Sequence, residues 1–347
     1  MTTPKPATIH DIARLAGVSS ATVSRVLSNS GYPVSAKLRE KILRTAKEVH
    51  YVPNLLGKQL KTNINTTIGV IVPSITNPFY SSVLLGIEET ARKNNYNVLL
   101  CNSMHDPVLE ETYLRTTFEK QIRGLILSSI TEDKKAIQDY IRMGQRIIAI
   151  DQKIDDAGIS QVEFDYHKGG LLATRHLIAN GHRRIAFVTA PLDRPSRIGI
   201  HSGYLEAMRE AGLELLVKET ARDHKYDGIY EFENGKALTS MLLEEEDKPT
   251  AVFACNDMTA FGVIHQLDAS GFRVPDDISV IGFDGIDFGE IVRPALTTIK
   301  QPNAEMGRLA CSMLMEAMQS DGFEPVHLLL QPKLIERQSV APIAIEA

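Results

Sequence analysis

Residues 8–28 read TIHDIARLAGVSSATVSRVLS, and this stretch decides the fold of the N-terminal part. Apolar side chains recur three, four and seven positions after Ile9, which is the spacing of one helical face. A Thr-x-x-Asp capping box at Thr8 starts this helix, and Gly17 ends it in a tight turn. A second short helix starts at Ser19. Two short helices joined at a glycine predict a helix-turn-helix, whose second helix lies in the DNA major groove.

A third, longer helix follows in the sequence. It begins at the N-cap Ser35, buries a face that includes Leu38 and Ile42, and ends before Pro53. Residues 1–62 hold ten Lys and Arg against three Asp and Glu, a net charge of +7, whereas the whole chain carries −5 and the remainder therefore −12. A basic head on an acidic body predicts a polyanionic partner for the head alone.

The sequence pattern changes after residue 66, where short β-branched runs alternate with helical stretches. This is the pattern of parallel sheets covered by helices, and it occurs twice, split near residue 162. The sequence therefore predicts two similar α/β lobes, with ligand-binding loops at the carboxyl ends of the strands. The strands are expected at Ile68–Val72, Asn97–Leu100, Gly124–Leu127, Ile147–Ile150, Ile185–Thr189, Ala251–Ala254 and Ile278–Gly282.

These segments carry a resemblance that runs through nearly the whole chain. Thr8–Ser28 resembles the DNA-binding head of the LacI/GalR family of bacterial transcriptional regulators, and the order of the later motifs matches too. Those motifs are VSAKLREKI (Val34–Ile42), YVPN (Tyr51–Asn54), IGVIVP (Ile68–Pro73), NPFY (Asn77–Tyr80), HLIANGHRRIAFV (His176–Val188), NDMTAFG (Asn256–Gly262), VPDDISVIGFD (Val274–Asp284) and LTTI (Leu296–Ile299).

The resemblance implies a small all-α helix-turn-helix head and an α/β two-lobe body like a periplasmic binding protein, with parallel sheets. The expected divisions are 1–52 for the head and 53–66 for the hinge helix and linker. The first lobe is expected at 67–162 plus 294–322, and the second at 163–293 plus 323–347. Three crossings between the lobes are therefore expected near 162, 294 and 323.

The DNA-contacting residues are expected on the second helix and in the hinge. Ser20 and Ala21 would face base edges, and Arg25 would form a bidentate pair with a guanine or bind a phosphate. The resemblance implies that Asn54 caps a short hinge helix and that Leu60 wedges into the minor groove. The full expected set is Thr8, Ser19, Ser20, Ala21, Thr22, Ser24, Arg25, Asn54, Gly57, Leu60 and Lys61.

An effector site is implied in the cleft between the lobes. Carboxylates and amides exchange hydrogen bonds with hydroxyl groups, and aromatic faces stack on C–H surfaces, which suits a sugar or sugar derivative. The sequence departs from the family pattern at Ile200, where many family members have an arginine. Either Arg197 or His201 takes over the role of that arginine, or the ligand lacks the group that the arginine binds. The expected site residues are Phe79, Tyr80, Asp151, Asp165, Arg194, Ser196, Arg197, Tyr230, Asn256 and Asp284.

The leading hypothesis is a dimeric or tetrameric repressor that binds a near-palindromic operator in double-stranded DNA under the control of this effector. The alternative is a solute-binding protein of the same two-lobe fold with no DNA role; it would need a secretory signal, and the N-terminus has none. A sugar-modifying enzyme is a third hypothesis, disfavoured because the sequence contains no GxSxG, HExxH or P-loop motif. The pattern leaves open whether the effector releases the protein from DNA or promotes binding.

Three well-separated cysteines, Cys101, Cys255 and Cys311, form neither a disulfide framework nor a CxxC metal motif, which favours the cytoplasm. No metal, cofactor or membrane contact is expected, because the histidines lack ligand spacing and no apolar run approaches about 18 residues.

Overall fold

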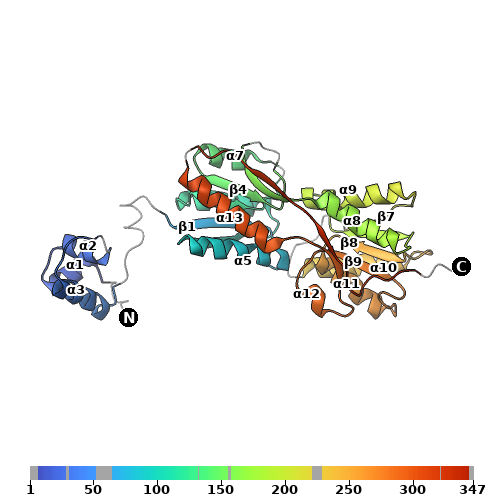
Figure 1. Cartoon of the computed structure of the whole chain (residues 1–347), viewed down its shortest axis with the longest axis horizontal. Helices are drawn as coiled ribbons and strands as arrows, with labels where there is room; N and C mark the ends of the chain where they lie inside the picture. The colour runs from blue at the N-terminus through green and yellow to red at the C-terminus, as the bar shows by residue number, and fades with distance from the viewer. Residues whose placement is uncertain are drawn as a thin grey trace. The chain divides into compact units, whose positions relative to one another are not determined.

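The computed structural model describes residues 7–28, 31–51, 65–131, 133–154, 158–220, 229–320 and 322–343. The chain divides into two compact units, residues 1–65 and 66–347, which are considered separately (Figure 1).

The first unit contains the three predicted helices, α1 (Ile9–Ala16), α2 (Ser20–Leu27) and α3 (Ala36–Glu48). The capping box is present, since the Thr8 hydroxyl accepts a hydrogen bond from the Asp11 N–H and the Asp11 carboxylate accepts one from the Thr8 N–H. Gly17 has a left-handed backbone, with φ of 70°, as a turn after a helix requires.

The three helices enclose one small core. Ile12, Val23 and Ile42, one from each helix, are fully buried in it. Because α2 buries Val23 and Val26 on one side, its other side faces solvent. The head is thus held together by apolar contacts that leave the second helix free to bind a partner.

The second unit contains two six-stranded sheets, each covered by helices, and each sheet with its helices is called a lobe here (Figure 1). In the first lobe the strand order is β11-β5-β4-β3-β1-β2, and all neighbouring strands are parallel. Its elements are β1 (Thr67–Val72), α5 (Pro78–Lys93), β2 (Asn97–Asn102), α6 (Pro107–Glu119), β3 (Gly124–Leu127), α7 (Lys135–Arg142), β4 (Arg146–Ile150), β5 (Ser160–Phe164), α13 (Asn303–Gln319) and β11 (His327–Leu330).

The second lobe repeats this plan with the strand order β12-β10-β9-β8-β6-β7. Its strands are parallel except for β12, which pairs antiparallel with β10. Its elements are α8 (Tyr166–Ala179), β6 (Ile185–Thr189), α9 (Pro195–Glu210), β7 (Leu216–Glu219), α10 (Tyr230–Leu243), β8 (Ala251–Ala254), α11 (Asp257–Ala269), β9 (Ser279–Asp284), α12 (Phe288–Ile291), β10 (Thr297–Lys300) and β12 (Lys333–Ile335).

The crossings between the lobes lie later in the chain than the expected positions near 162, 294 and 323. The segment Thr297–Lys300, expected in the first lobe, is strand β10 of the second, because it pairs with β9. The segment His327–Leu330, expected in the second lobe, pairs with β5 of the first. The chain therefore crosses at about 165, 301 and 331, in each case just after the end of a strand.

The helices of the body pack in unusually close pairs. In the α8–α9 pair, a Cβ added to Gly170 would lie 2.1 Å from the Ile200 carbonyl oxygen, and one added to Gly203 would lie 2.1 Å from that of His167. Glycine at both positions lets the two backbones touch, which fixes where α9 lies. The same reciprocal arrangement joins α5 to α13 and α10 to α11, through Gly86, Gly307, Gly235 and Gly262.

Candidate DNA-binding surface and effector pocket

The residues expected to contact DNA in the head lie on α2 or just before it. Ser19 caps the helix, accepting a hydrogen bond from the Thr22 N–H, and Ala21 and Arg25 are exposed. The Arg25 guanidinium lies 4.2 Å from the centre of the Tyr32 ring, a cation–π contact that orients it at the surface. Ser20, Thr22 and Ser24 are half-buried on the same helix.

Two further observations concern this surface. Thr8 is exposed but uses its hydroxyl in the capping box of α1, so its local role is to start that helix. His10, which the sequence did not single out, has its Nδ1 atom 3.0 Å from the Ser20 hydroxyl oxygen and so adjoins the start of α2. The hinge residues Asn54, Gly57, Leu60 and Lys61 lie outside the described residues, and their roles stay predictions.

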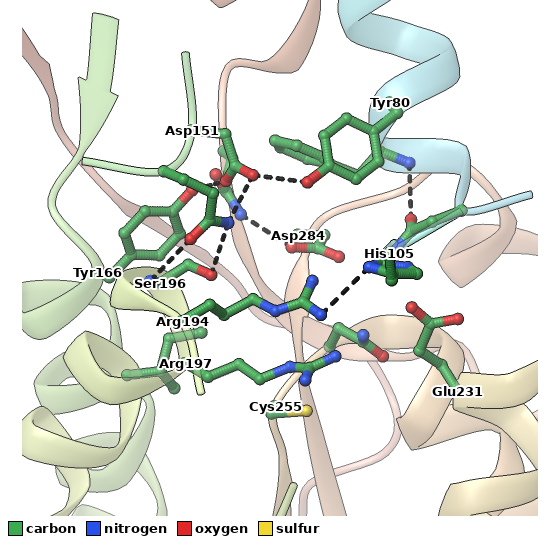
Figure 2. A pocket seen from close by; sticks show the side chains of 16 residues that line it. Tyr80, His105, Asp151, Tyr166, Arg194, Ser196, Arg197, Glu231, Cys255 and Asp284 are labelled. Carbon is green, nitrogen blue, oxygen red and sulfur yellow. Dashed lines mark hydrogen bonds between the residues drawn. The ribbon is translucent and has the colours of Figure 1, made fainter. Parts of the chain in front are cut away.

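A pocket lies in the body and is lined by side chains from both lobes (Figure 2). Eight of the ten expected effector residues line it: Phe79, Tyr80, Asp151, Arg194, Ser196, Arg197, Asn256 and Asp284. The lining residues that were not in the expected set are Asn77, His105, Gln152, Tyr166, Ile200, Glu231, Cys255 and Gln301.

Asp165 and Tyr230 are not among the residues that line this pocket, and their roles as effector contacts stay predictions. Asp165 caps α8, and its carboxylate accepts the Lys168 N–H at 2.9 Å, so this carboxylate serves the helix start. Tyr230 is the first residue of α10, and the next residue, Glu231, lines the pocket instead. Successive helical residues point about 100° apart, so the two side chains face different surroundings.

Asp151 is the most heavily hydrogen-bonded group of the pocket. Its carboxylate accepts bonds from the Tyr80 hydroxyl at 2.7 Å, the Gln152 amide at 2.7 Å and the Tyr166 hydroxyl (Figure 2). It also accepts one from the Ser128 hydroxyl at 3.1 Å. Burial, and then the Asp151 charge, raise the pKa of Tyr80 and of Tyr166 well above the usual value, so both phenols stay protonated donors. Because Tyr166 belongs to the second lobe, Asp151 joins the lobes.

Two other sets of hydrogen bonds cross between the lobes. The side-chain Nε2 of Gln152 donates to the Ser196 hydroxyl at 2.9 Å, and the Ser196 backbone N–H donates back to the side-chain Oε1 of Gln152 at 3.3 Å. Arg194 donates to Nδ1 of His105 at 3.2 Å. Burial and the charges of Arg194 and Arg197 lower the pKa of His105 to about 2. His105 is therefore neutral, with Nδ1 accepting from Arg194 and Nε2 carrying the proton.

Asp284 lies at the carboxyl end of β9 and accepts a bond from the Gln301 amide at 2.8 Å. Burial raises its pKa well above the usual value, and the nearby Asp257 and Asp151 carboxylates raise it further. This favours the protonated acid, which both donates to and accepts from a ligand hydroxyl.

Three lining residues have a strained backbone. His105, Asp151 and Asp284 have φ of 57°, 63° and 110°, in the region that favours glycine. Such conformations cost about 1–3 kcal/mol each and persist where surrounding contacts hold them. Here the hydrogen bonds to each side chain hold the strained conformation. As a result, three polar side chains point into the same pocket.

The free space between these side chains has a volume of about 50 Å³. An apolar cavity of about 150 Å³ binds benzene, so this space is too small for a sugar ring and accommodates a few water molecules. A sugar-sized ligand therefore requires the lobes or the lining side chains to move. Within the described ranges, no His, Cys, Asp and Glu side chains gather as a metal site, and no helix is long and apolar enough to span a membrane.

Two parts of the chain match families of known proteins. Residues 8–54 match the family described as bacterial regulatory proteins, lacI family, and residues 174–340 match the periplasmic binding protein-like domain. The chain is 36% identical over 336 residues to the ribose operon repressor of Escherichia coli K12, covering 96% of this chain and 99% of that relative. The chain belongs to the lacI family.

Solved structures of lacI-family proteins agree with this assignment. The lac repressor dimer bound to operator and the anti-inducer ONPF is 28% identical, covers 97% of this chain and 100% of its own, and has a TM-score of 0.84. A LacI family transcriptional regulator from Enterococcus faecium with bound ribose is 32% identical, covers 80% of this chain and 100% of its own, and has a TM-score of 0.73.

This lacI-family chain is a DNA-binding transcription regulator with a helix-turn-helix head and a two-lobe ligand-binding body. The alternative of a solute-binding protein without a DNA role is set aside, because the family model matches the head itself.

Proposed function

We propose that this regulator is a homodimeric repressor whose affinity for a near-palindromic operator is set by a carbohydrate effector in the pocket between the lobes. The observation that carries the proposal is that both lobes line one pocket and are joined across it by hydrogen bonds. A ligand that enters must replace those bonds, so it binds one arrangement of the lobes better than another. Such differential affinity is what shifts a conformational equilibrium.

The carbohydrate class is supported by the chemistry of the lining. Phe79 and Tyr80 offer aromatic surface, and Asn256, Asp284 and Glu231 offer oxygen and nitrogen atoms that pair with hydroxyl groups. The relative with bound ribose gives further support. Dimerisation is proposed because two heads must meet two half-sites, which two-fold symmetry supplies.

The hinge is proposed to connect the two functions. A helix of about seven residues is unstable alone in water, because helix nucleation is costly. Gly57 weakens it by about a further 1 kcal/mol. We propose that Asn54–Lys61 becomes helical on operator DNA and that Leu60 enters the central base step.

We propose further that the protein performs no catalysis and acts in the cytoplasm. The absence of catalysis is supported by the ribose operon repressor, a relative named for repression. The three cysteines are buried and unpaired with one another, as suits a reducing compartment.

The test uses the full chain and an operator selected from a random DNA library. Fluorescence anisotropy of the labelled operator is measured with and without a panel of mono- and disaccharides, and sedimentation gives the oligomeric state. We expect a dimer whose operator affinity changes by about 5- to 150-fold with one sugar, the range typical of coupling between sites. Arg25→Ala is the matched control, since it should keep sugar binding and weaken specific DNA binding. Sugar binding that leaves operator affinity unchanged would contradict the proposal.

A further inference from the structure

The start of α2 carries three hydroxyl-bearing side chains, Ser19, Ser20 and Thr22, and their hydrogen bonds differ. The Ser19 hydroxyl accepts the Thr22 N–H at 3.2 Å and lies 2.9 Å from the Thr22 hydroxyl, so these two groups serve the helix cap and each other. The Ser20 hydroxyl lies instead 3.0 Å from Nδ1 of His10, a residue of α1. Of the three hydroxyl groups, that of Ser20 therefore joins α2 to α1.

His10 is held in place relative to Ser20 by the fold of the head. It is the second residue of α1, and the capping box described above fixes the start of this helix. Ile12 of α1 and Val23 of α2 are both fully buried in the core of the head, so the two helices are packed against each other close to the contact. The His10–Ser20 contact is thus a fixed part of the head itself.

Both side chains lie where a helix-turn-helix meets DNA. The N-terminal residues of the second helix face base edges in the major groove, and Ser20 is the first residue of α2. The next residue, Ala21, is exposed and ends at its Cβ, so it leaves space beside the Ser20 hydroxyl. His10 is exposed as well, and within the described residues its Nε2 has no hydrogen-bond partner. This nitrogen is therefore open to a phosphate of the DNA backbone.

The chemistry of the imidazole ring decides what Ser20 can offer to a base. In a neutral imidazole one ring nitrogen carries a proton and the other accepts a hydrogen bond. Phosphate oxygens in DNA only accept, so a phosphate beside Nε2 of His10 selects the form with the proton on Nε2 and leaves Nδ1 as the acceptor. The Ser20 hydroxyl then donates its single proton to Nδ1, and only its oxygen lone pairs face the groove.

We propose that His10 is a positioning residue that holds the Ser20 hydroxyl as an acceptor and thereby sets which base Ser20 selects. Adenine and cytosine each present an amino group in the major groove, whereas guanine and thymine present only acceptors there. Ser20 therefore selects adenine or cytosine, the amino bases, on the strand that it contacts. The inference concerns the head alone and needs no effector, so an operator affinity that no sugar changes contradicts the proposed effector control and leaves this inference standing.

The test measures the base preference of the full chain on an operator selected from random DNA. Each position of the half-sites in turn carries all four base pairs, and affinity is measured by fluorescence anisotropy at pH 8, at the upper end of the range in which histidines usually titrate. Ser20→Ala locates the base pair that Ser20 contacts, as the position where preference is lost. There we expect the wild type to bind amino bases on one strand about 3- to 10-fold more tightly per half-site than guanine or thymine, the effect of one hydrogen bond.

Chemical deletion of the amino group identifies the contacted strand. Purine in place of adenine, or 2-pyrimidinone in place of cytosine, lacks the amino group and should weaken wild-type binding by about the same 3- to 10-fold on one strand only. The same deletion should not affect Ser20→Ala, which has no hydroxyl to accept the bond. The matched DNA control is the same deletion at a position where Ser20→Ala leaves the preference unchanged.

Substitutions of His10 test its role directly. His10→Phe keeps a ring and removes Nδ1, so the Ser20 hydroxyl is free to donate or accept and the preference should fall to within about twofold of parity. His10→Lys offers only donors, so Ser20 accepts from the ammonium group, and the preference for amino bases should be abolished or reversed. His50→Phe is the matched control, because His50 is exposed after the end of α3, and it should leave every base preference unchanged.

Three results would overturn the inference. If Ser20→Ala alters the preference at no position, Ser20 selects no base. If deletion of the amino group leaves wild-type affinity unchanged on both strands, the Ser20 oxygen does not accept from that group. If His10→Phe keeps the wild-type preference, His10 does not set the role of Ser20. Each readout is a ratio between DNA sequences bound by one protein, so a partly unfolded variant cannot produce a reversed preference.

Discussion

Replacing Tyr166 by Phe should loosen the connection between the lobes without disturbing the packing of the ring. The Tyr166 ring stacks on Phe283 with centroids 6.1 Å apart and is only 8% exposed, and Phe fills the same space. What is lost is the hydroxyl donor to the Asp151 carboxylate. A hydrogen bond to a charged group contributes about 1.5–3 kcal/mol. Since Asp151 keeps three donors, from Tyr80, Ser128 and Gln152, we expect the lower end of this range.

Two assays measure this effect. A loss of about 1.5 kcal/mol should lower the thermal midpoint of the body by about 3–6 °C, given about 2–4 °C per kcal/mol for domains of 150–250 residues. The same loss should change the apparent effector affinity by up to about tenfold, because 1.4 kcal/mol is a factor of ten in an equilibrium between lobe arrangements. Tyr113→Phe is the control, since it removes one hydroxyl from a half-buried ring. If Tyr166→Phe behaves like the control in both assays, the bond to Asp151 does not join the lobes energetically and the reasoning is refuted.

Four further predictions test other parts of the molecule. Arg25→Ala should weaken specific operator binding by about 1–3 kcal/mol while the thermal midpoint of the body stays unchanged, and an unaltered gel shift at fixed salt would contradict this. Asp284→Ala should abolish the effector response and preserve DNA binding, because it removes both the donor and the acceptor, as calorimetry and anisotropy would show. Gly203→Ala should destabilise the body by about 1–3 kcal/mol or more in urea unfolding, because the added Cβ would clash with the His167 carbonyl oxygen. Gly322→Ala is the control and should be nearly neutral, because a Cβ there meets open space. Burial raises the pKa of Asp257 from 3.8 to about 7, so between these values the folded protein holds a proton that the unfolded chain has released. The free energy of unfolding should therefore fall as the pH rises from about 4 to about 7. Asp257→Asn should flatten this dependence of stability on pH.

The head was predictable because its determinants are local. The Thr8 capping box, the Gly17 turn and the apolar spacing all lie within one helical turn of the features they specify. The seven predicted strands of the body were confirmed for the same reason, since each is a short β-branched run.

The exchange of strands between the lobes was not predictable in this way. Thr297–Lys300 and His327–Leu330 are short, and the choice of sheet depends on pairing with β9 and β5, more than ten and more than 160 residues earlier in the chain. The expected crossings were therefore displaced, although the number of lobes was correct.

The pocket was predictable where a residue follows a strand, and less so elsewhere. Asp151 and Asp284 stand at strand ends, and the structure places both in the lining. Glu231 was missed because which of two neighbouring helical residues faces a pocket depends on where the helix begins. His105 was missed because its position depends on a left-handed backbone conformation, with φ of 57°. A histidine in the sequence does not indicate this conformation, as a glycine would.

Strand β1 shows how the fold can connect the pocket to the DNA-binding unit through the chain itself. It starts at Thr67, directly after the residues that join the head, and ends at Val72, shortly before the pocket residues Asn77–Tyr80. Six extended residues span about 20 Å, and β1 is hydrogen-bonded on both sides, to β2 and β3, so it moves with its lobe as a rigid element. We propose that a change in the angle between the lobes, beginning at Asp151 and Tyr166, moves the start of β1. On this proposal, the movement changes the spacing of the two hinge starts in a dimer, and that spacing sets whether the hinges pair over DNA. The effector would then control DNA binding without contacting DNA.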